Sequence, residues 1–68
     1  MENIKITTEY IELGKLLKIL DFTSSGGEAK YFLKENNVYV DGIKEERRGR
    51  KIYPGSSVKI NNKIFKIE

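Results

Sequence analysis

The stretch from Ser24 to Gly42 constrains the fold of this chain more than any other part of it. It holds a predicted helix start, a short amphipathic segment, a pair of asparagines and a strand pattern that ends in Asp41-Gly42. Ser25 and Glu28 have the spacing of a capping box, in which a serine and a glutamate three residues later accept hydrogen bonds from each other's backbone N–H groups. The stretch therefore predicts a helix, an exit and a strand in immediate succession.

The helix within this stretch has a defined inward face, formed by Ala29, Phe32 and Leu33. Gly26 and Gly27 are expected in its first turn. Asn36-Asn37 suits the exit, because asparagine tolerates the left-handed conformation in which many helices end.

An earlier helix is predicted from about Glu12, because leucines at positions 13, 16, 17 and 20 share one helical face. Lys15 and Lys18 point away from that face. Gly14 lowers helix propensity by about 1 kcal/mol relative to alanine, so it is either a tolerated surface glycine or a site of close approach. Alternating apolar residues also predict a short strand near residues 3–7.

Turn signals predict a series of short strands after the second helix. Asp41-Gly42 is a strong hairpin signal, since both residues accept positive φ, and Pro54-Gly55 suits a type II turn. A turn at Asn61-Asn62 pairs position 60 with 63 and position 58 with 65. This register predicts one apolar face, whose members are Val58, Ile60, Phe65 and Ile67.

Composition narrows the function classes. The chain has 68 residues, no cysteine and no histidine, so it predicts one domain over 1–68 with no disulfide, no thiolate metal site and no histidine base. The carboxylates show no pairing that would support catalysis. No apolar run has the length of a membrane span and no signal-peptide pattern opens the chain, so we expect a cytoplasmic, non-enzymatic protein without metal or cofactor.

The loop from Lys44 to Lys51, the arginine loop, is the most basic part of the chain. It contains all three arginines, and its net charge equals the +3 of the whole chain. The guanidinium group presents a planar fork of donors that matches phosphate oxygens and stacks on bases. The loop therefore predicts nucleic-acid contact, or alternatively a solvated loop whose charge keeps the protein soluble. Its candidate contact residues are Arg47, Arg48, Arg50 and Lys51.

The predicted second helix supplies another candidate surface. A helix N-terminus exposes unpaired N–H groups, and glycines there let a phosphate come close. Lys30 and Lys34 extend a positive strip along the same helix. The alternative is ordinary capping with two surface lysines. The Walker spacing is absent, which argues against nucleoside triphosphate binding.

Four tyrosines are candidate stacking platforms for unpaired bases, namely Tyr10, Tyr31, Tyr39 and Tyr53. Tyr31 and Tyr39 lie off the predicted apolar faces and are therefore the better candidates. The alternative for each is partial burial at a helix–sheet boundary.

Taken together, S-x-x-E-A-x-x-F-L, V-Y-V-D-G and P-G-x-x-V-x-I resemble the αL RNA-binding motif, the small domain of small-subunit ribosomal protein S-four. The resemblance runs from about residue 11 to 60, with a C-terminal hairpin at about 56–67, and is nearest to stand-alone members of YaaA type. It implies an α+β fold, with two N-terminal helices packed on a small bent, mostly antiparallel sheet of four to five short strands. It also implies that the helices and an adjoining loop bind structured RNA.

Two positions depart from the family pattern. Members of the family often carry arginine where this chain has Glu12 and Gly26, so positive charge is lost from the usual RNA-binding face. We therefore place the predicted contacts on a wider set: Lys15, Lys18, Ser25, Gly26, Gly27, Lys30, Lys34, Arg47, Arg48, Arg50 and Lys51.

The sequence thus predicts an RNA-binding module, which we assume to be a monomer. The resemblance implies ribosomal RNA or a ribosomal particle as its first target, transfer RNA as its second and ribosomal subunit proteins as further partners. Two alternatives stay open. One is a protein-interaction adaptor that has lost RNA binding, and the other is a small-anion or nucleotide binder at Gly26-Gly27.

Overall fold

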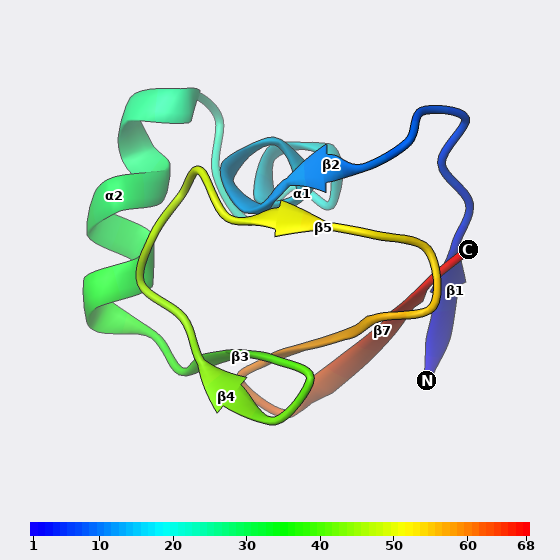
Figure 1. Cartoon of the computed structure of the whole chain (residues 1–68). Coiled ribbons are helices and arrows are strands. Elements are labelled where there is room, and N and C mark those ends of the chain that lie inside the picture. Colours follow the sequence, from blue (N-terminus) through cyan, green and yellow to red (C-terminus); the bar gives the residue numbers. More distant parts are fainter.

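The computed structural model describes residues 1–68 and contains two helices packed against one side of a five-stranded sheet (Figure 1). The sheet order is β1-β7-β6-β3-β4, with β1 parallel to β7 and the other neighbours antiparallel. A separate ladder joins β2 to β5. The predicted α+β class and mostly antiparallel sheet are confirmed. The elements are β1 (Glu2–Ile4), β2 (Ile11–Glu12), α1 (Leu13–Ile19), α2 (Gly26–Glu35), β3 (Val38–Val40), β4 (Ile43–Lys44), β5 (Lys51–Ile52), β6 (Ser57–Ile60) and β7 (Lys63–Ile67).

The C-terminal hairpin has the register that the sequence predicts. Ile60 pairs with Lys63 and Val58 with Phe65, and Asn61 adopts φ of 54° in the turn. The four apolar side chains assigned to one face are all buried, while Ile64 points to the opposite face. The period-two pattern therefore determined this register correctly.

The Asp41-Gly42 turn is also confirmed. Both residues have positive φ, at 51° and 83°, and Val40 pairs with Ile43 across the turn. The Asp41 carboxylate accepts hydrogen bonds from the Ser56 hydroxyl at 2.9 Å and from the Ser57 backbone N–H at 3.0 Å. The turn is thereby fastened to the start of β6.

The core lies between the helices and the inner face of the sheet. Leu13, Leu16 and Leu17 of α1 are completely buried, and Leu20 is half-buried, as the helical spacing predicts. Phe22 packs against Phe32 at 5.6 Å between ring centroids, and it also packs against a core phenylalanine of β7. Neither helix has the length and apolar character needed to cross a bilayer.

The N-terminal strand differs from the prediction. It covers Glu2–Ile4 rather than residues 3–7, and it runs parallel to β7, which no local pattern indicated. The backbone N–H of Ile6 still bonds the carbonyl of Glu68 at 2.8 Å. The chain thus stays beside β7 past the end of β1, although the regular ladder stops at Ile4.

Two predictions about the ends of α2 are wrong in detail. Ser25 holds the N-cap position without a side-chain bond, and Glu28 instead accepts from the hydroxyl of Ser24 at 2.7 Å and from its backbone N–H at 3.1 Å. At the exit, Asn36 is extended rather than left-handed, and its amide donates to the Phe32 carbonyl at 3.0 Å. The side-chain amide satisfies the helix end, so a left-handed residue is not needed.

Candidate nucleic-acid interface

The arginine loop is fastened to the beginning of α1 through its backbone. Glu12 pairs with Lys51 in the short β2–β5 ladder. The N–H of Leu13 then bonds the Arg50 carbonyl at 2.9 Å, and the N–H of Gly14 bonds the Arg48 carbonyl at 2.8 Å. The loop therefore satisfies N–H groups that the first turn of a helix otherwise leaves unpaired.

Gly14 permits this close contact. It is buried, and a Cβ built on it would lie 3.3 Å from both the Cβ and the carbonyl oxygen of Arg48. The interpretation of Gly14 as a tolerated surface glycine is wrong, and the close-approach alternative is confirmed. The segment that approaches it is the arginine loop itself.

A single carboxylate organises the interior of the loop. Glu45 is only 5% exposed and accepts hydrogen bonds from Nε of Arg47 at 2.9 Å, Nη2 of Arg47 at 3.1 Å and Nη1 of Arg50 at 2.9 Å. It also accepts from the backbone N–H groups of Glu46 and Arg47. The hydrogen bond from the Arg47 side chain is the largest of several effects that lower the pKa of Glu45 to about 2.

Two of the three arginines are consequently paired within the protein. Arg47 nevertheless keeps 75% of its side chain exposed and Arg50 keeps 33%. Each guanidinium has five N–H donors, so both retain donors that point to solvent. The sequence analysis counted only the net charge of the loop, and the structure shows that one buried carboxylate is paired with two of its three arginines.

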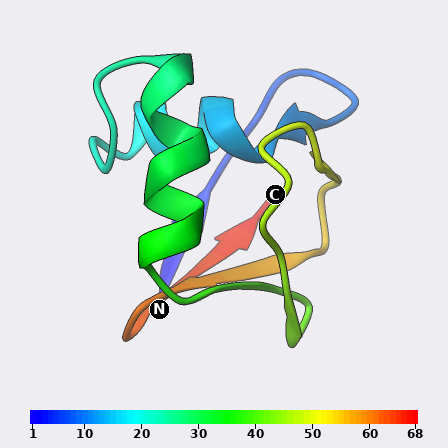
Figure 2. The ribbon, with the colours of Figure 1, turned by 90° about the vertical axis from the view of Figure 1, so that its left-hand side faces the viewer.

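Arg48 connects the loop to the second helix. Its Nη1 donates to the carbonyl of Gly26 at 3.1 Å, and the loop runs beside α2 in Figure 2. A hollow of about 360 Å³, which we call the polar hollow, opens where the loop, α1 and α2 meet. It is lined by Glu12, Gly14, Lys15, Gly26, Arg48 and Gly49.

The polar hollow brings together residues from three predicted groups: Lys15 of α1, Gly26 of α2 and Arg48 of the loop. The two positions that depart from the family pattern, Glu12 and Gly26, line the same hollow. A Cβ on Gly26 would meet nothing within 4 Å, so a side chain at this position has open space.

The other candidate residues surround the hollow or lie beyond it. Four of them, Lys18, Ser25, Lys30 and Lys34, are exposed on α1, at the start of α2 and along α2. None of the three lysines in this group has a carboxylate partner. Gly27, the second residue of α2, is exposed next to Gly26.

Lys51 points to an aromatic pair rather than to the hollow. Its ammonium lies 4.9 Å from the centre of the Tyr10 ring, and Tyr10 packs against Tyr53 at 5.7 Å between ring centroids. Tyr31 is 66% exposed on α2, whereas Tyr39 is half-buried on the sheet. The structure thus keeps Tyr31 and Tyr39 apart from the paired tyrosines.

Sequence reasoning missed the part played by Glu45, which it counted only as a negative charge in a basic loop. A local signal exists, because basic residues follow Glu45 at spacings of two and five, but the burial that makes this carboxylate a centre of the loop has no local signature. No group of three or more acidic side chains in the structure could hold a metal ion.

Comparisons with known proteins identify the family. The family model of the S4 domain matches residues 4–68 of this chain. A Bacillus subtilis (strain 168) protein named "Probable ribosome maturation protein RlbA" is 51% identical over 57 residues, which cover 84% of this chain and 80% of that protein. An Escherichia coli (strain K12) protein named "Putative RNA-binding protein YbcJ" is 41% identical over 49 residues, which cover 72% of this chain and 70% of that protein. The fold and these matches establish that the chain belongs to the S4 family of RNA-binding domains.

Proposed function

We propose that this protein binds ribosomal RNA through the polar hollow and the basic residues around it, and that it acts in ribosome maturation. The observation that carries the proposal is the convergence of Lys15, Arg48 and the start of α2 on one hollow. The name of the Bacillus subtilis relative supports the choice of ribosomal RNA as target. Transfer RNA is the second candidate target. Ribosomal subunit proteins are further partners of this protein.

The proposed mechanism is electrostatic positioning on folded RNA. Phosphates of the RNA backbone contact Lys15, Lys18, Lys30 and Lys34 and the outward-facing donors of the arginines. A folded RNA displays its phosphates in a fixed arrangement, so shape rather than base sequence supplies the selectivity. No catalytic step is part of this function, and we place the protein in the cytoplasm, where ribosomes mature.

The strongest test is the salt dependence of binding to ribosomal RNA fragments. If about five phosphates are neutralised, log affinity falls with log salt with a slope of roughly −3.5 to −4.5. The triple variant Lys15→Ala, Lys30→Ala, Lys34→Ala is expected to make this slope shallower by about 2 to 3. These lysines have no carboxylate partner, so the substitutions leave no buried charge behind.

Lys63→Ala is the matched control, because Lys63 is an exposed lysine at the far hairpin of β6 and β7. It removes one positive charge, as each single lysine substitution does, without touching the helices or the loop. An affinity that does not depend on salt, or equal weakening by the control and by single substitutions at the hollow, would contradict the proposal. The adaptor alternative is separated by a pull-down from nuclease-treated extract, in which protein partners that survive nuclease favour the adaptor.

A further inference from the structure

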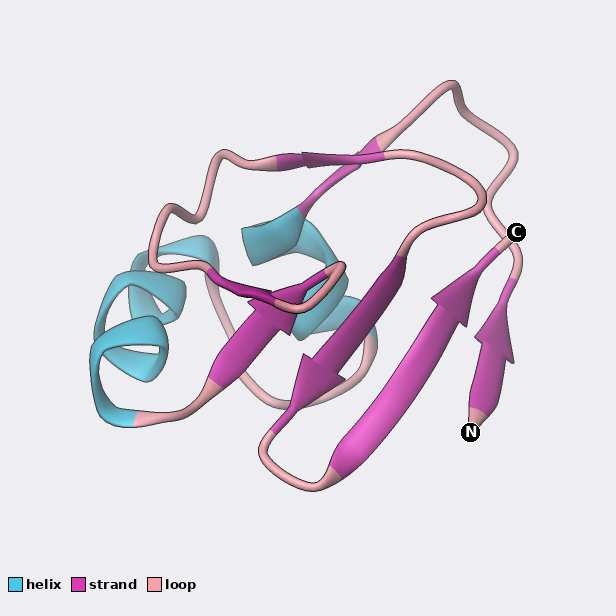
Figure 3. Ribbon diagram, turned by 60° about the horizontal axis from the view of Figure 1, so that its bottom comes forward, coloured by secondary structure: helices cyan, strands magenta, loops and turns pink.

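The five-stranded sheet has one face that no helix covers, which we call the open sheet face. In Figure 3 this face is turned forward and both helices lie behind it. Strand pairing aligns four side chains across it, because Lys44 pairs with Tyr39, Tyr39 with Lys59, and Lys59 with Ile64. Paired residues of neighbouring strands share a face, so these four form one row across β4, β3, β6 and β7.

The charge of this row is entirely positive. The strand positions with the same outward alternation are Asn3, Ser57 and Lys66, and none of them is acidic. Lys44 and Lys59 have no carboxylate partner, since both ion pairs of the protein are made by Glu45. Lys66 donates only to the carbonyl of Gly55. The Asp41 carboxylate at the adjoining turn already accepts hydrogen bonds from Ser56 and Ser57, whereas the lysines of the row are free to attract anions.

Protection of the sheet edge does not explain the row. A lysine on an edge strand prevents pairing with other chains, and this accounts for Lys44 on β4. Tyr39 and Lys59, however, lie on β3 and β6, which are interior strands of the sheet. Their outward side chains therefore do not protect an edge of the sheet.

An aromatic and an apolar side chain adjoin these charges. Tyr39 is half-buried and is flanked by Lys44 on one side and Lys59 on the other, while Ile64 is 42% exposed beside them. A hollow of about 310 Å³ opens here, lined by Tyr39, Gly42, Ser57, Lys59 and Ile64. Neighbouring strands lie about 4.8 Å apart, so the whole row crosses about 14 Å of sheet.

We propose that the open sheet face is a second RNA-binding surface, one that takes unpaired nucleotides. A base stacks on Tyr39, and the adjoining phosphates contact Lys44 and Lys59. Single-stranded RNA matches both features, because it carries a negative backbone and a planar base at every nucleotide. An acidic peptide would match only the lysines.

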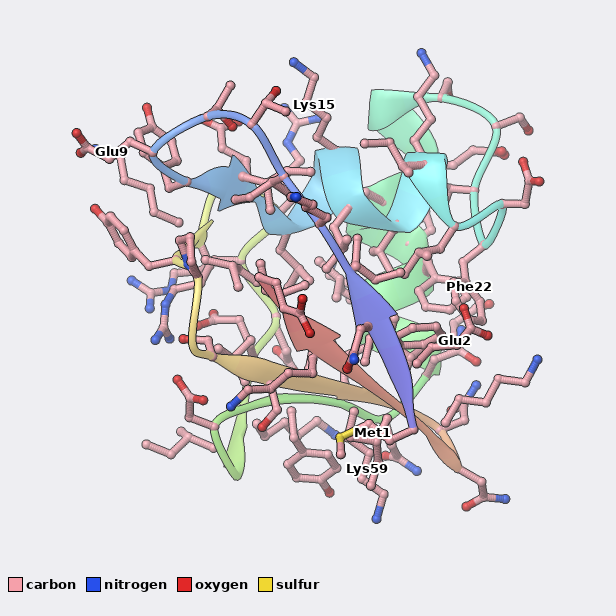
Figure 4. The ribbon with its side chains drawn as sticks, turned by 90° about the vertical axis from the view of Figure 1, so that its right-hand side faces the viewer. Met1, Glu2, Glu9, Lys15, Phe22 and Lys59 are labelled. Carbon is pink, nitrogen blue, oxygen red and sulfur yellow. The ribbon has the colours of Figure 1, made fainter.

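This surface is separate from the polar hollow. Figure 4 shows Lys15, which lines the hollow, and Lys59, which lies in the row, at opposite ends of the molecule. The proposal goes beyond the proposed function, since folded RNA at the helices and an unpaired strand at the sheet could be bound at the same time. An RNA that carries a single-stranded extension beside a folded element would engage both surfaces.

The test uses the whole protein, labelled with ¹⁵N, and a short oligouridine of about eight nucleotides that forms no folded structure. We expect amide shifts to concentrate in β3, β4 and β6 around the row. Tyr39→Leu is expected to weaken binding about tenfold, which corresponds to about 1.4 kcal/mol. Tyr39→Phe keeps the ring and should bind as the parent protein does.

Two further variants complete the design. Lys59→Ala should make the salt slope shallower by about 0.7. Ile19→Ala removes an exposed apolar side chain from α1 and should change nothing, because it lies off the open sheet face. Thermal unfolding of each variant checks that it remains folded. If Tyr39→Leu does not remain folded, Tyr39→Phe keeps the stacking claim testable.

Shifts confined to α1, α2 and the arginine loop would overturn this proposal, and so would equal binding by Tyr39→Leu and the parent protein. Shifts at the row with oligoglutamate but not with oligouridine would also overturn it and would indicate an acidic protein partner. If oligouridine binds at the row while the folded ribosomal fragment does not bind at all, the further inference stands and the proposed function fails. The two proposals are thus tested separately.

Discussion

The arginine loop and the lysines of the two helices carry the same sign of charge but are held in opposite ways. Arg47 and Arg50 donate to a buried carboxylate, and Arg48 donates to a carbonyl of α2. Lys15 and Lys30, in contrast, project into solvent without a carboxylate partner. The comparison indicates that the arginines first build the frame of the site, while the lysines of the helices supply charge that is free to meet phosphate.

The largest effect is expected from removing the Glu45 carboxylate, which holds the arginine loop together. Glu45→Ala removes the acceptor of two arginines and two backbone N–H groups, and we expect it to lower the free energy of unfolding by about 2 to 3 kcal/mol. Urea denaturation measures this change. Glu46→Ala is the matched control, since Glu46 is exposed, and it should change stability by less than about 0.5 kcal/mol. Equal effects of the two substitutions would refute the central position given to Glu45.

The same contrast predicts that the free energy of unfolding falls at acidic pH, which we call the acid limb of its pH dependence. The pKa of Glu45 is about 2 in the folded protein, which is below its ordinary value of 4.5. A lowered carboxyl pKa contributes stability that is fully present above the ordinary value and is lost as pH falls through the folded value. We therefore expect the free energy of unfolding to decrease between about pH 5 and pH 2.

The Glu45→Gln variant tests the origin of this limb, because it keeps the shape of the side chain and removes its titration. Its stability should depend less on pH over the same interval. Hydrogen bonds from Ser24 also lower the pKa of Glu28, so Glu28→Gln serves as the comparison for a carboxylate outside the loop. An acid limb that persists unchanged in Glu45→Gln would contradict the assignment.

A smaller effect is expected at the contact between the loop and α1. Gly14→Val places a branched side chain against the Cβ and carbonyl oxygen of Arg48, and overpacking of this kind costs about 1 to 3 kcal/mol. The temperature of thermal unfolding and the RNA affinity should both decrease, because the loop must move away from the helix. Gly49→Ala is the control for stability, since a Cβ there meets nothing within 4 Å. A variant at Gly14 that keeps full stability would show that the close approach is not required.

The smallest effect is expected from a substitution that adds one positive charge beside the polar hollow. Gly26→Arg places a guanidinium in the open space beside the polar hollow. RNA affinity should increase several-fold, and the salt slope should become steeper by about 0.7 to 0.9 if one more phosphate is contacted. Filter binding at several salt concentrations measures both quantities. Unchanged affinity would mean that the RNA does not approach this hollow.

Local patterns predicted much of this fold. The leucine spacing of α1, the Asp41-Gly42 turn and the Asn61-Asn62 register all depend on residues a few positions apart, and all three are confirmed. The prediction for the ends of α2 was less accurate, because several neighbouring polar side chains compete for the same N–H and C=O groups. Ser24 and Asn36 took bonds that the spacing assigned differently.

The candidate site was predicted as a set of residues and not as an arrangement. Lys15, Gly26 and Arg48 were all identified, but their meeting in one hollow follows from contacts between distant parts of the chain. The partner of Gly14, the pairing of β2 with β5 and the burial of Glu45 depend on the same contacts. None of these has a periodic signature.

The sequence by itself determined the two helices, the C-terminal hairpin, their apolar faces, the family and the overall positive charge. Only the tertiary structure decided which charges are free. The physical reason is that periodicity and turn chemistry act over a few residues, whereas the pairing of a charge depends on what the folded chain brings within hydrogen-bond distance. Arginine and lysine count equally in the net charge of +3, and the fold alone separates the paired arginines from the free lysines of the helices and of the open sheet face.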